Sequence, residues 1–168
     1  NGLVVDTRRA MNRIISIDPD AQVAVVQPGV VLGQLNAALK PHGLFFAPHV
    51  STGSRATIGG MVSTDAAGKG SLVYGRTNKH VIGLQAVLAD GTPWNVGKVT
   101  GAELDQLAQR SDRLGALHRL VREATLGLRS EAFPDVPRGF SGYNLADATA
   151  GPGIDFTKIL TGSEGTLA

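Results

Sequence analysis

The residues best suited to chemistry gather in one stretch, residues 48–68, where the adjacent Gly59 and Gly60 are flanked by serines and threonines. Adjacent glycines let backbone N–H groups approach a diphosphate closely, and hydroxyl groups donate to its oxygens without adding charge. A glycine-rich surface loop has the same composition. The residue types alone therefore leave two interpretations open, an anion cradle and an ordinary turn region.

Other common sites are poorly supported. A dinucleotide-binding Gly-x-Gly-x-x-Gly would begin at Gly68 or Gly151, but Val73 and Phe156 stand where the third glycine belongs. The four histidines include no His-x-x-x-His pair, so we expect no metal. The sequence has no cysteine, which excludes a disulfide, a thiolate site or an iron–sulfur cluster within these residues. Redox chemistry would need a bound organic cofactor.

Composition narrows the class of protein. The 168 residues are 42% hydrophobic, enough for the core of one domain. Sixteen basic residues against fourteen acidic ones give a formal charge of +2, which does not predict nucleic-acid binding. The sequence has no apolar run near the roughly 18 residues of a membrane span and no basic leader. Membrane association is not indicated, and a cytoplasmic location is the default expectation.

The elements that must position the glycine-rich stretch are predicted from hydrophobic spacing. Three short runs predict strands, at residues 3–6, 14–17 and 23–26, and the last two form a hairpin. Residues 31–39 have helical spacing and end in a stop at Gly43. No periodicity holds over residues 46–75, so we expect a long functional loop there. Within it, residues 57–68 are predicted to lead into a short helical turn with free backbone N–H groups.

The second half predicts a further hairpin and two helices. Residues 81–89 are expected to be extended, and Asp90-Gly91 forms a turn that leads into a strand over 92–96, which completes the hairpin. A helix over 102–109 and another over 114–128, capped by Ser111, follow. Residues 129–155 are irregular, and a strand is expected at Ile159-Leu160. The order ββαββαα–loop–β predicts an α+β fold.

The stretch at residues 48–68 resembles the second diphosphate segment of the FAD-linked oxidases of the vanillyl-alcohol-oxidase (PCMH) type. That family's pattern runs Pro, small residues, Ala-Thr-Ile-Gly-Gly, then Ser/Thr-x-Ala-x-Gly. Further family blocks follow in the same order: Tyr74-Gly75-Arg76-Thr77, Val87-Leu88-Ala89-Asp90-Gly91, Ser141-Gly142-Tyr143-Asn144-Leu145, and Leu160-Thr161-Gly162-Ser163-Glu164-Gly165-Thr166-Leu167. Four ordered blocks across the chain make coincidence a poor explanation.

The glycine-tyrosine block and the long segment at 129–155 are most similar to the D-2-hydroxy acid dehydrogenases, which act on D-lactate, glycolate or D-2-hydroxyglutarate. This resemblance implies the second subdomain of the PCMH-type FAD-binding fold, a mixed, mostly antiparallel sheet flanked by helices. It also implies that residues 1–168 are a partial FAD-binding domain, without the upstream first diphosphate loop and the downstream substrate domain. An iron–sulfur module would lie outside these residues.

The resemblance further implies non-covalent FAD and assigns its contacts. The cofactor-binding candidates are Pro48, Ser51, Thr52, Ser54, Thr57, Ile58, Gly59, Gly60, Ser63, Thr64, Gly68, Tyr74, Gly75, Glu164, Gly165 and Thr166. Tyr74 is equally interpretable as a core aromatic residue, and Thr166 as a helix N-cap. The catalytic residue is not identified; Arg138, Tyr143 and Asn144 are candidates for facing the flavin and a substrate carboxylate. A surface role is the alternative for Arg138.

The implied reaction is hydride transfer from the α-carbon of a D-2-hydroxy acid to the flavin, with electrons passing on to an acceptor. Two alternatives remain open: a cofactor-binding or structural module without turnover, and an FAD-linked reductase of another substrate class. Without the upstream loop, the 168 residues alone are expected to lose about 2 to 6 kcal/mol of FAD binding and to purify largely colourless.

Overall fold

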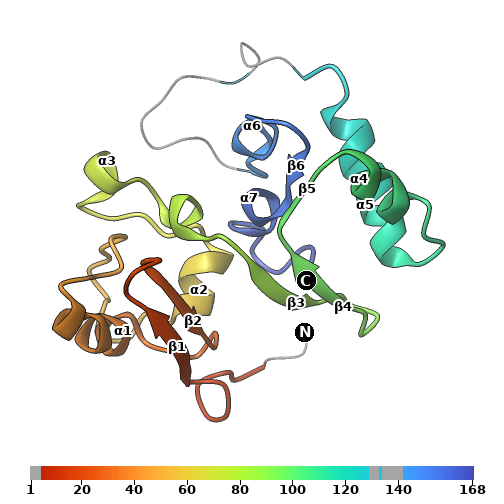
Figure 1. Ribbon diagram of the computed structural model, residues 1–168. Helices are drawn as coiled ribbons and strands as arrows, with labels where there is room; N and C mark the ends of the chain where they lie inside the picture. The colour runs from red at the N-terminus through yellow and green to blue at the C-terminus, as the bar shows by residue number, and fades with distance from the viewer. Residues whose placement is uncertain (1–4, 129–132, 134–141) are drawn as a thin grey trace. The chain divides into compact units, whose positions relative to one another are not determined.

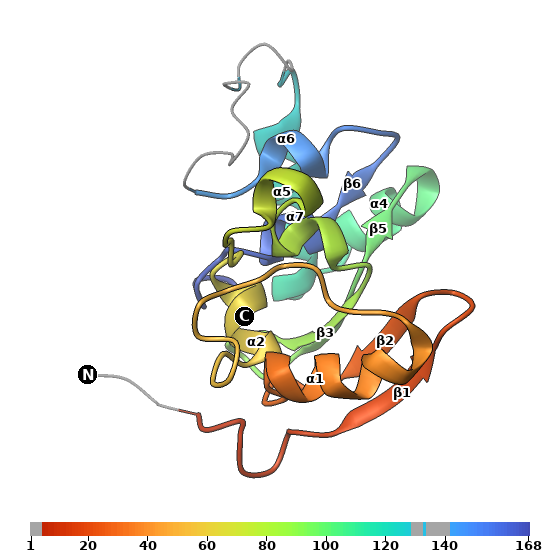
Figure 2. The ribbon, with the colours of Figure 1, turned by 90° about the vertical axis from the view of Figure 1, so that its left-hand side faces the viewer.

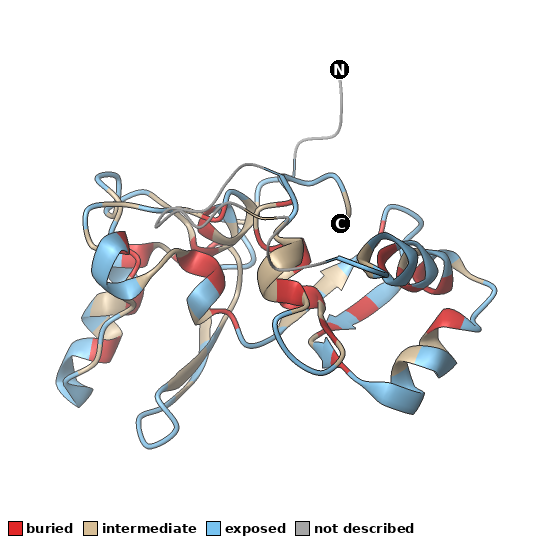
Figure 3. Cartoon of the chain, turned by 90° about the horizontal axis from the view of Figure 1, so that it is seen from above, coloured by how far each residue is buried: buried red, intermediate tan, exposed pale blue. Residues whose placement is uncertain are grey.

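The computed structural model describes residues 5–128, 133 and 142–168 (Figure 1). The chain divides into two compact units, Asn1–His80 and Val81–Ala168, here called the N-terminal and C-terminal units. Both mix helices with short antiparallel strands, which confirms the predicted α+β fold. Each unit has a hydrophobic core of its own (Figure 3).

The N-terminal unit begins with the predicted hairpin. Strands β1 (Ile14–Asp18) and β2 (Val23–Val26) pair antiparallel, and an irregularity in register follows Ile14. Helix α1 (Leu32–Leu39) continues into a 3₁₀ turn and ends at Gly43, whose φ of 69° is the left-handed conformation that glycine adopts without strain. The predicted hairpin and helix are thus confirmed. Val5 and Asp6, the described part of the strand expected at 3–6, are not in a strand.

The predicted long loop contains short helices. These are α2 (Ile58–Ser63) and α3 (Ser71–Tyr74), and a 3₁₀ turn at Thr77–His80 follows the loop. Figure 2 shows α1 and α2 beside the hairpin. Their apolar side chains form the core of this unit, with Val30, Leu32, Leu35, Leu39, Ile58 and Met61 buried.

The C-terminal unit has the second predicted hairpin. Strand β3 (Leu84–Val87) pairs antiparallel with β4 (Pro93–Val96), and Gly91 turns between them at a φ of 85°. A shorter pair joins β5 (Lys98–Val99) to β6 (Ile154–Asp155). Among the described residues the strands therefore form three separate two-stranded sheets rather than one continuous sheet.

Helices α4 (Gly101–Ala108) and α5 (Arg113–Thr125) match the two predicted helices. The expected cap at Ser111 is wrong by one residue. Asp112 caps α5, because its Oδ1 accepts a hydrogen bond from the Gly115 N–H at 3.0 Å. The paired Arg110 guanidinium and this N–H lower the pKa of Asp112 to about 2.

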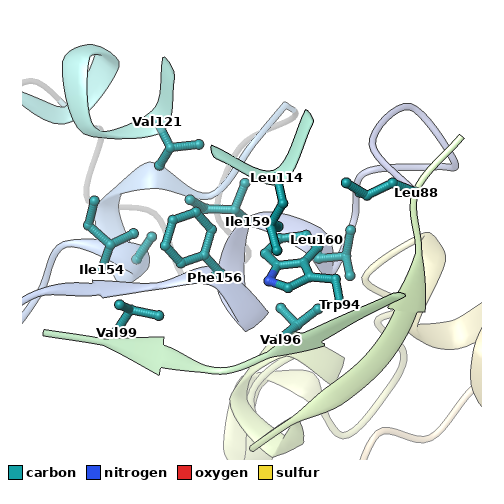
Figure 4. Close-up of a cluster of buried hydrophobic side chains, with 11 residues drawn as sticks. Leu88, Trp94, Val96, Val99, Leu114, Val121, Ile154, Phe156, Ile159 and Leu160 are labelled. Atoms are coloured by element: carbon teal, nitrogen blue, oxygen red, sulfur yellow. The ribbon is translucent and has the colours of Figure 1, made fainter. Parts of the chain in front are cut away.

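The strand expected at Ile159-Leu160 is also wrong, because these residues belong to helix α7 (Phe156–Leu160). Asp155 caps α7 by accepting from the Thr157 N–H at 3.0 Å. Phe156, Ile159 and Leu160 then point from one side of the helix into the core, where Phe156 packs against Trp94 (Figure 4). A short helix α6 (Leu145–Ala148) precedes it. No helix in the described part of the chain is long and apolar enough to cross a bilayer.

Candidate functional site

The first part of the predicted diphosphate segment, residues 48–54, is a turn region held near both ends (the 48–54 loop), and near its far end the Gly33 N–H donates to the Gly53 carbonyl at 2.9 Å. Pro48 is fully buried and so packs inside the unit. Ser51, Thr52 and Ser54 are exposed, and their backbone N–H groups donate to no other described residue. Open N–H groups and neighbouring hydroxyls are the kinds of donor that an anion accepts. Ser51, Thr52 and Ser54 are therefore the residues of this loop with exposed, open N–H groups.

The two glycines lie in the first turn of α2, but their N–H groups are not free. The Gly59 N–H donates to the Pro28 carbonyl at 2.8 Å, and the Gly60 N–H donates to Thr57 Oγ1 at 3.2 Å. The expectation of free N–H groups at this turn is therefore wrong. Gly59 is needed for packing instead, because a Cβ there would lie 2.6 Å from the Cβ of Pro28.

Neighbouring residues of α2 are also structural. The Ile58 N–H donates to the Val30 carbonyl at 2.8 Å and the Ile58 side chain is buried. Thr64 Oγ1 donates to the Gly60 carbonyl at 2.9 Å. Ser63 is half-buried at the end of the helix. The Ile58 and Thr64 contacts therefore help to hold α2 in place.

Thr57 is the N-cap of α2, and replacing it tests that role. Thr57→Ala is expected to lower the free energy of unfolding by about 1 kcal/mol, because the Gly60 N–H loses its acceptor. Thr57→Ser keeps the hydroxyl and should retain most of the stability. Urea denaturation measures both variants, and an alanine variant as stable as the unmodified chain would contradict the assignment.

Gly68 connects the end of this segment to its beginning. A Cβ on Gly68 would lie 1.5 Å from the carbonyl oxygen of His49 and 3.3 Å from Cα of Val50. The Gly68 N–H donates to Ser71 Oγ at 2.8 Å. The backbone at Gly68 thus lies directly against the 48–54 loop and supports it.

A pocket of about 370 Å³ opens in the same unit. It is lined by Asn36, Phe45, Phe46, Ala47, His49, Lys69, Gly70 and Tyr74. Tyr74 is 48% exposed and meets Phe45 edge to face at 5.7 Å, so it is not a core aromatic residue. Gly75 ends α3 at a φ of 80°. Tyr74 thus offers an aromatic wall beside His49.

In the C-terminal unit the structure brings together two blocks that lie far apart in the sequence. Tyr143 Oη is 2.7 Å from Thr166 Oγ1, and Thr166 Oγ1 donates to the Ser163 carbonyl at 2.6 Å. A hydroxyl has one proton, so Tyr143 is the donor in this pair. Glu164 and Gly165 both have left-handed backbone, with φ of 51° and 75°. Thr166 closes this turn through its N–H and its hydroxyl, which both donate to the Ser163 carbonyl.

The remaining candidates have structural partners or fall outside the described residues. Asn144 caps α6: its Oδ1 accepts from the Asp147 N–H at 3.1 Å and its Nδ2 donates to Asp147 Oδ2 at 2.7 Å. Arg138 lies outside the described residues. Within residues 5–128, 133 and 142–168, no three His, Asp or Glu side chains gather closely enough to hold a metal ion.

The chain is similar to known proteins over most of its length. Residues 1–97 match the family model of the FAD binding domain. The D-2-hydroxyglutarate dehydrogenase of Pseudomonas putida is 43% identical over 171 residues, which are 99% of this chain and 17% of that protein. The chain belongs to the FAD-binding-domain family. The corresponding enzyme of Escherichia coli K12 is 42% identical over 99% of the chain and 17% of its own length. The D-lactate dehydrogenase of Archaeoglobus fulgidus is 39% identical over 78% of the chain and 28% of its own length.

The chain of this FAD-binding domain spans about one sixth of the D-2-hydroxyglutarate dehydrogenases that it matches. The family match at residues 1–97 includes the 48–54 loop, α2 and the pocket beside Tyr74. The turn at residues 162–166 lies beyond it. The relatives that match 99% of the chain extend the similarity to that turn.

FAD is the cofactor of this family, and the 48–54 loop of the domain fits its diphosphate. The loop offers the N–H and hydroxyl groups of Ser51, Thr52 and Ser54, and it has no carboxylate that would repel an anion. Gly68 lets the backbone support the loop from behind. The donor set is neutral, which suits a ligand held by hydrogen bonds.

Sequence reasoning assigned no role to Asp65 and Arg76 of this domain. Arg76 Nε lies 2.9 Å from Asp65 Oδ2, and Asp65 has a φ of 44°. A signal was present, since Asp65 is the only acidic residue between positions 21 and 89. A solitary acid in a glycine-rich, ligand-binding stretch calls for a partner, and the sequence alone did not say which arginine supplies it.

Proposed function

We propose that this chain is the FAD-binding part of a flavin-dependent dehydrogenase that oxidises D-2-hydroxy acids. The observation that carries the proposal is the 48–54 loop, whose open N–H groups and hydroxyls suit a diphosphate. The substrate class is supported by the relatives, since proteins named D-2-hydroxyglutarate dehydrogenase match 99% of the chain. Proteins named D-lactate dehydrogenase and glycolate oxidase subunit match shorter parts of it.

The residues of the chain bind and orient, and the cofactor supplies the redox chemistry. Bound FAD would accept a hydride from the substrate. Ser51, Thr52 and Ser54 would donate to the diphosphate. We expect FAD itself to be bound non-covalently. Glu164 and Gly165 would present backbone at a second surface, which the Tyr143–Thr166 hydrogen bond keeps in shape. The base that removes the hydroxyl proton is not assigned to a described residue.

The first test is flavin binding by the protein as it is encoded, with any sequence that flanks these residues. Titration of the flavin-free protein with FAD should quench flavin fluorescence and saturate at one FAD per chain. Denaturation should release all of the flavin into the supernatant, because the attachment is non-covalent. A folded protein that leaves FAD fluorescence unchanged would end the proposal.

The second test is substrate class. The flavin-loaded protein should reduce a dye with D-2-hydroxyglutarate, D-lactate or glycolate as electron donor, and the L-enantiomers of the two chiral acids serve as controls. Under anaerobic conditions, the acids that support dye reduction should also bleach the flavin absorbance, and the L-enantiomers should not. Bleaching by NADPH alone, with no response to any 2-hydroxy acid, would favour a reductase of another substrate class instead.

A further inference from the structure

Asp65 has a left-handed backbone. It follows the end of α2 with a φ of 44°, a conformation that is uncommon for residues other than glycine, although aspartate and asparagine adopt it more often than most. Asp65 is buried, with 9% of its surface exposed. A buried carboxylate on a strained backbone is retained only when its surroundings hold it in that place.

Arg76 and its neighbours provide that hold. Arg76 Nε lies 2.9 Å from Asp65 Oδ2, and Arg76 Nη2 donates to the Asp65 backbone carbonyl at 3.0 Å. The Asn78 N–H donates to Asp65 Oδ1 at 2.8 Å. One guanidinium thus binds both the side chain and the backbone of the same residue, and its rigid planar fork does so with less loss of freedom than a lysine ammonium would. We call the Asp65–Arg76 pair the clasp.

The next residues extend the same connection. The Thr77 N–H and Oγ1 both donate to the Ala66 carbonyl, at 3.2 and 2.8 Å. Asp65 and Ala66 are therefore joined to Arg76, Thr77 and Asn78 residue by residue. The path of the chain after α2 is determined by these contacts.

That path leads directly to the 48–54 loop. Gly68 follows Asp65 by three residues, and its backbone lies against the His49 carbonyl so closely that no Cβ would fit. A shift of residues 65–68 would consequently move the surface on which the loop rests. The N–H groups of Ser51, Thr52 and Ser54 would then point in other directions.

We propose that Asp65 and Arg76 are positioning residues for the diphosphate, which they reach through Gly68 and the 48–54 loop. The inference rests on the proposed function, because it concerns the same FAD site. Neither side chain needs to touch the cofactor. Outer partners of this kind change ligand affinity by about 10- to 100-fold at metal sites, and an effect of about tenfold is expected here.

The experiment compares FAD affinity with folding. Arg76→Gln removes the charge and the fork, and the FAD dissociation constant is measured by fluorescence quenching on the encoded protein. The measurement is made where urea titration shows that both proteins are fully folded. Under that condition a merely stabilising contact leaves the dissociation constant unchanged, because affinity depends on the folded fraction. The clasp predicts about tenfold weaker binding, with partial recovery in Arg76→Lys.

Arg122→Gln is the matched control. Arg122 Nη1 lies 2.9 Å from Asp105 Oδ1 in an exposed ion pair of the C-terminal unit, and its loss should leave FAD affinity unchanged. Failure of the unmodified protein to bind FAD would refute the proposed function. Normal binding by the unmodified protein and equal binding by folded Arg76→Gln would refute the clasp alone. If Arg76→Gln does not fold, Arg76→Lys is measured in its place, and its binding must then be clearly weaker.

Discussion

Gly68→Ala is expected to lower the free energy of unfolding by about 3 kcal/mol or more, and to weaken FAD binding as well. The added Cβ would lie 1.5 Å from the His49 carbonyl oxygen and 2.6 Å from the His49 carbonyl carbon. Backbone atoms cannot rotate away as a flexible side chain can. The two chain segments must therefore separate, which exposes Pro48 and changes the shape of the loop above it.

Gly97→Ala is the control for this substitution. A Cβ at Gly97 would meet no atom within 4 Å, and the backbone there does not have a left-handed φ. Alanine at such a site is neutral or stabilises by about 0.4 to 1 kcal/mol, because it restricts the unfolded chain. Urea denaturation and FAD titration on both variants give the comparison. Equal stability of the two variants would show that the contact at Gly68 relaxes without penalty.

Stability is expected to fall as the pH decreases below about 6.5, with His118 as a main cause. His118 is fully buried and packs against Phe156 at 4.5 Å and Trp94 at 5.9 Å between ring centroids. Its Nδ1 donates to the Leu114 carbonyl at 2.7 Å, and its Nε2 has no partner among the described residues. A proton on Nε2 would therefore be buried without an acceptor.

Burial lowers the pKa of His118, and this effect exceeds the opposing hydrogen bond to Leu114. Between the lowered pKa and the usual value near 6.5, the unfolded chain binds a proton that the folded chain does not. Protons then favour unfolding. The contribution of neutral His118 is complete above 6.5 and is lost at up to about 1.4 kcal/mol for each pH unit below it.

Urea denaturation at several pH values, followed by Trp94 fluorescence, measures this slope. His118→Phe should reduce the slope below pH 6.5, whereas His42→Gln, which changes an exposed histidine, should leave it unchanged. Proton NMR of the His118 ring gives a second readout that does not depend on a variant. A ring signal that titrates at 6.5 or above would refute the prediction.

Elements with local periodicity were predictable from the sequence, and elements fixed by distant contacts were not. The β1–β2 hairpin and α1 match the prediction because alternation and helical spacing lie within each segment. Helix α7 was mistaken for a strand because Ile159-Leu160 is too short to show a period without Phe156. The N–H of Gly59 was expected to be free because its acceptor, Pro28, lies 31 residues earlier in the sequence.

The candidate site likewise has features that the sequence could predict and features that it could not. Residue types and family resemblance predicted ligand contacts in the 48–54 loop and at residues 164–166. They could not show that Thr57 caps a helix or that Tyr143 donates to Thr166, since both depend on side-chain geometry. The clasp joins residues 11 positions apart across a glycine-rich segment that has no periodicity.

The hydrogen bonds that hold the first turn of α2 have a consequence for how a cofactor enters. Because the Pro28 and Val30 carbonyls already accept the N–H groups of Gly59 and Ile58, this turn is built when the protein folds and not when a ligand arrives. Residues 51–54 are also held, because the Gly33 N–H donates to the Gly53 carbonyl at 2.9 Å, so association would order few rotatable bonds. Loop motions of this size take nanoseconds to microseconds. Encounter by diffusion, rather than rearrangement of the protein, would then limit how fast the empty site fills.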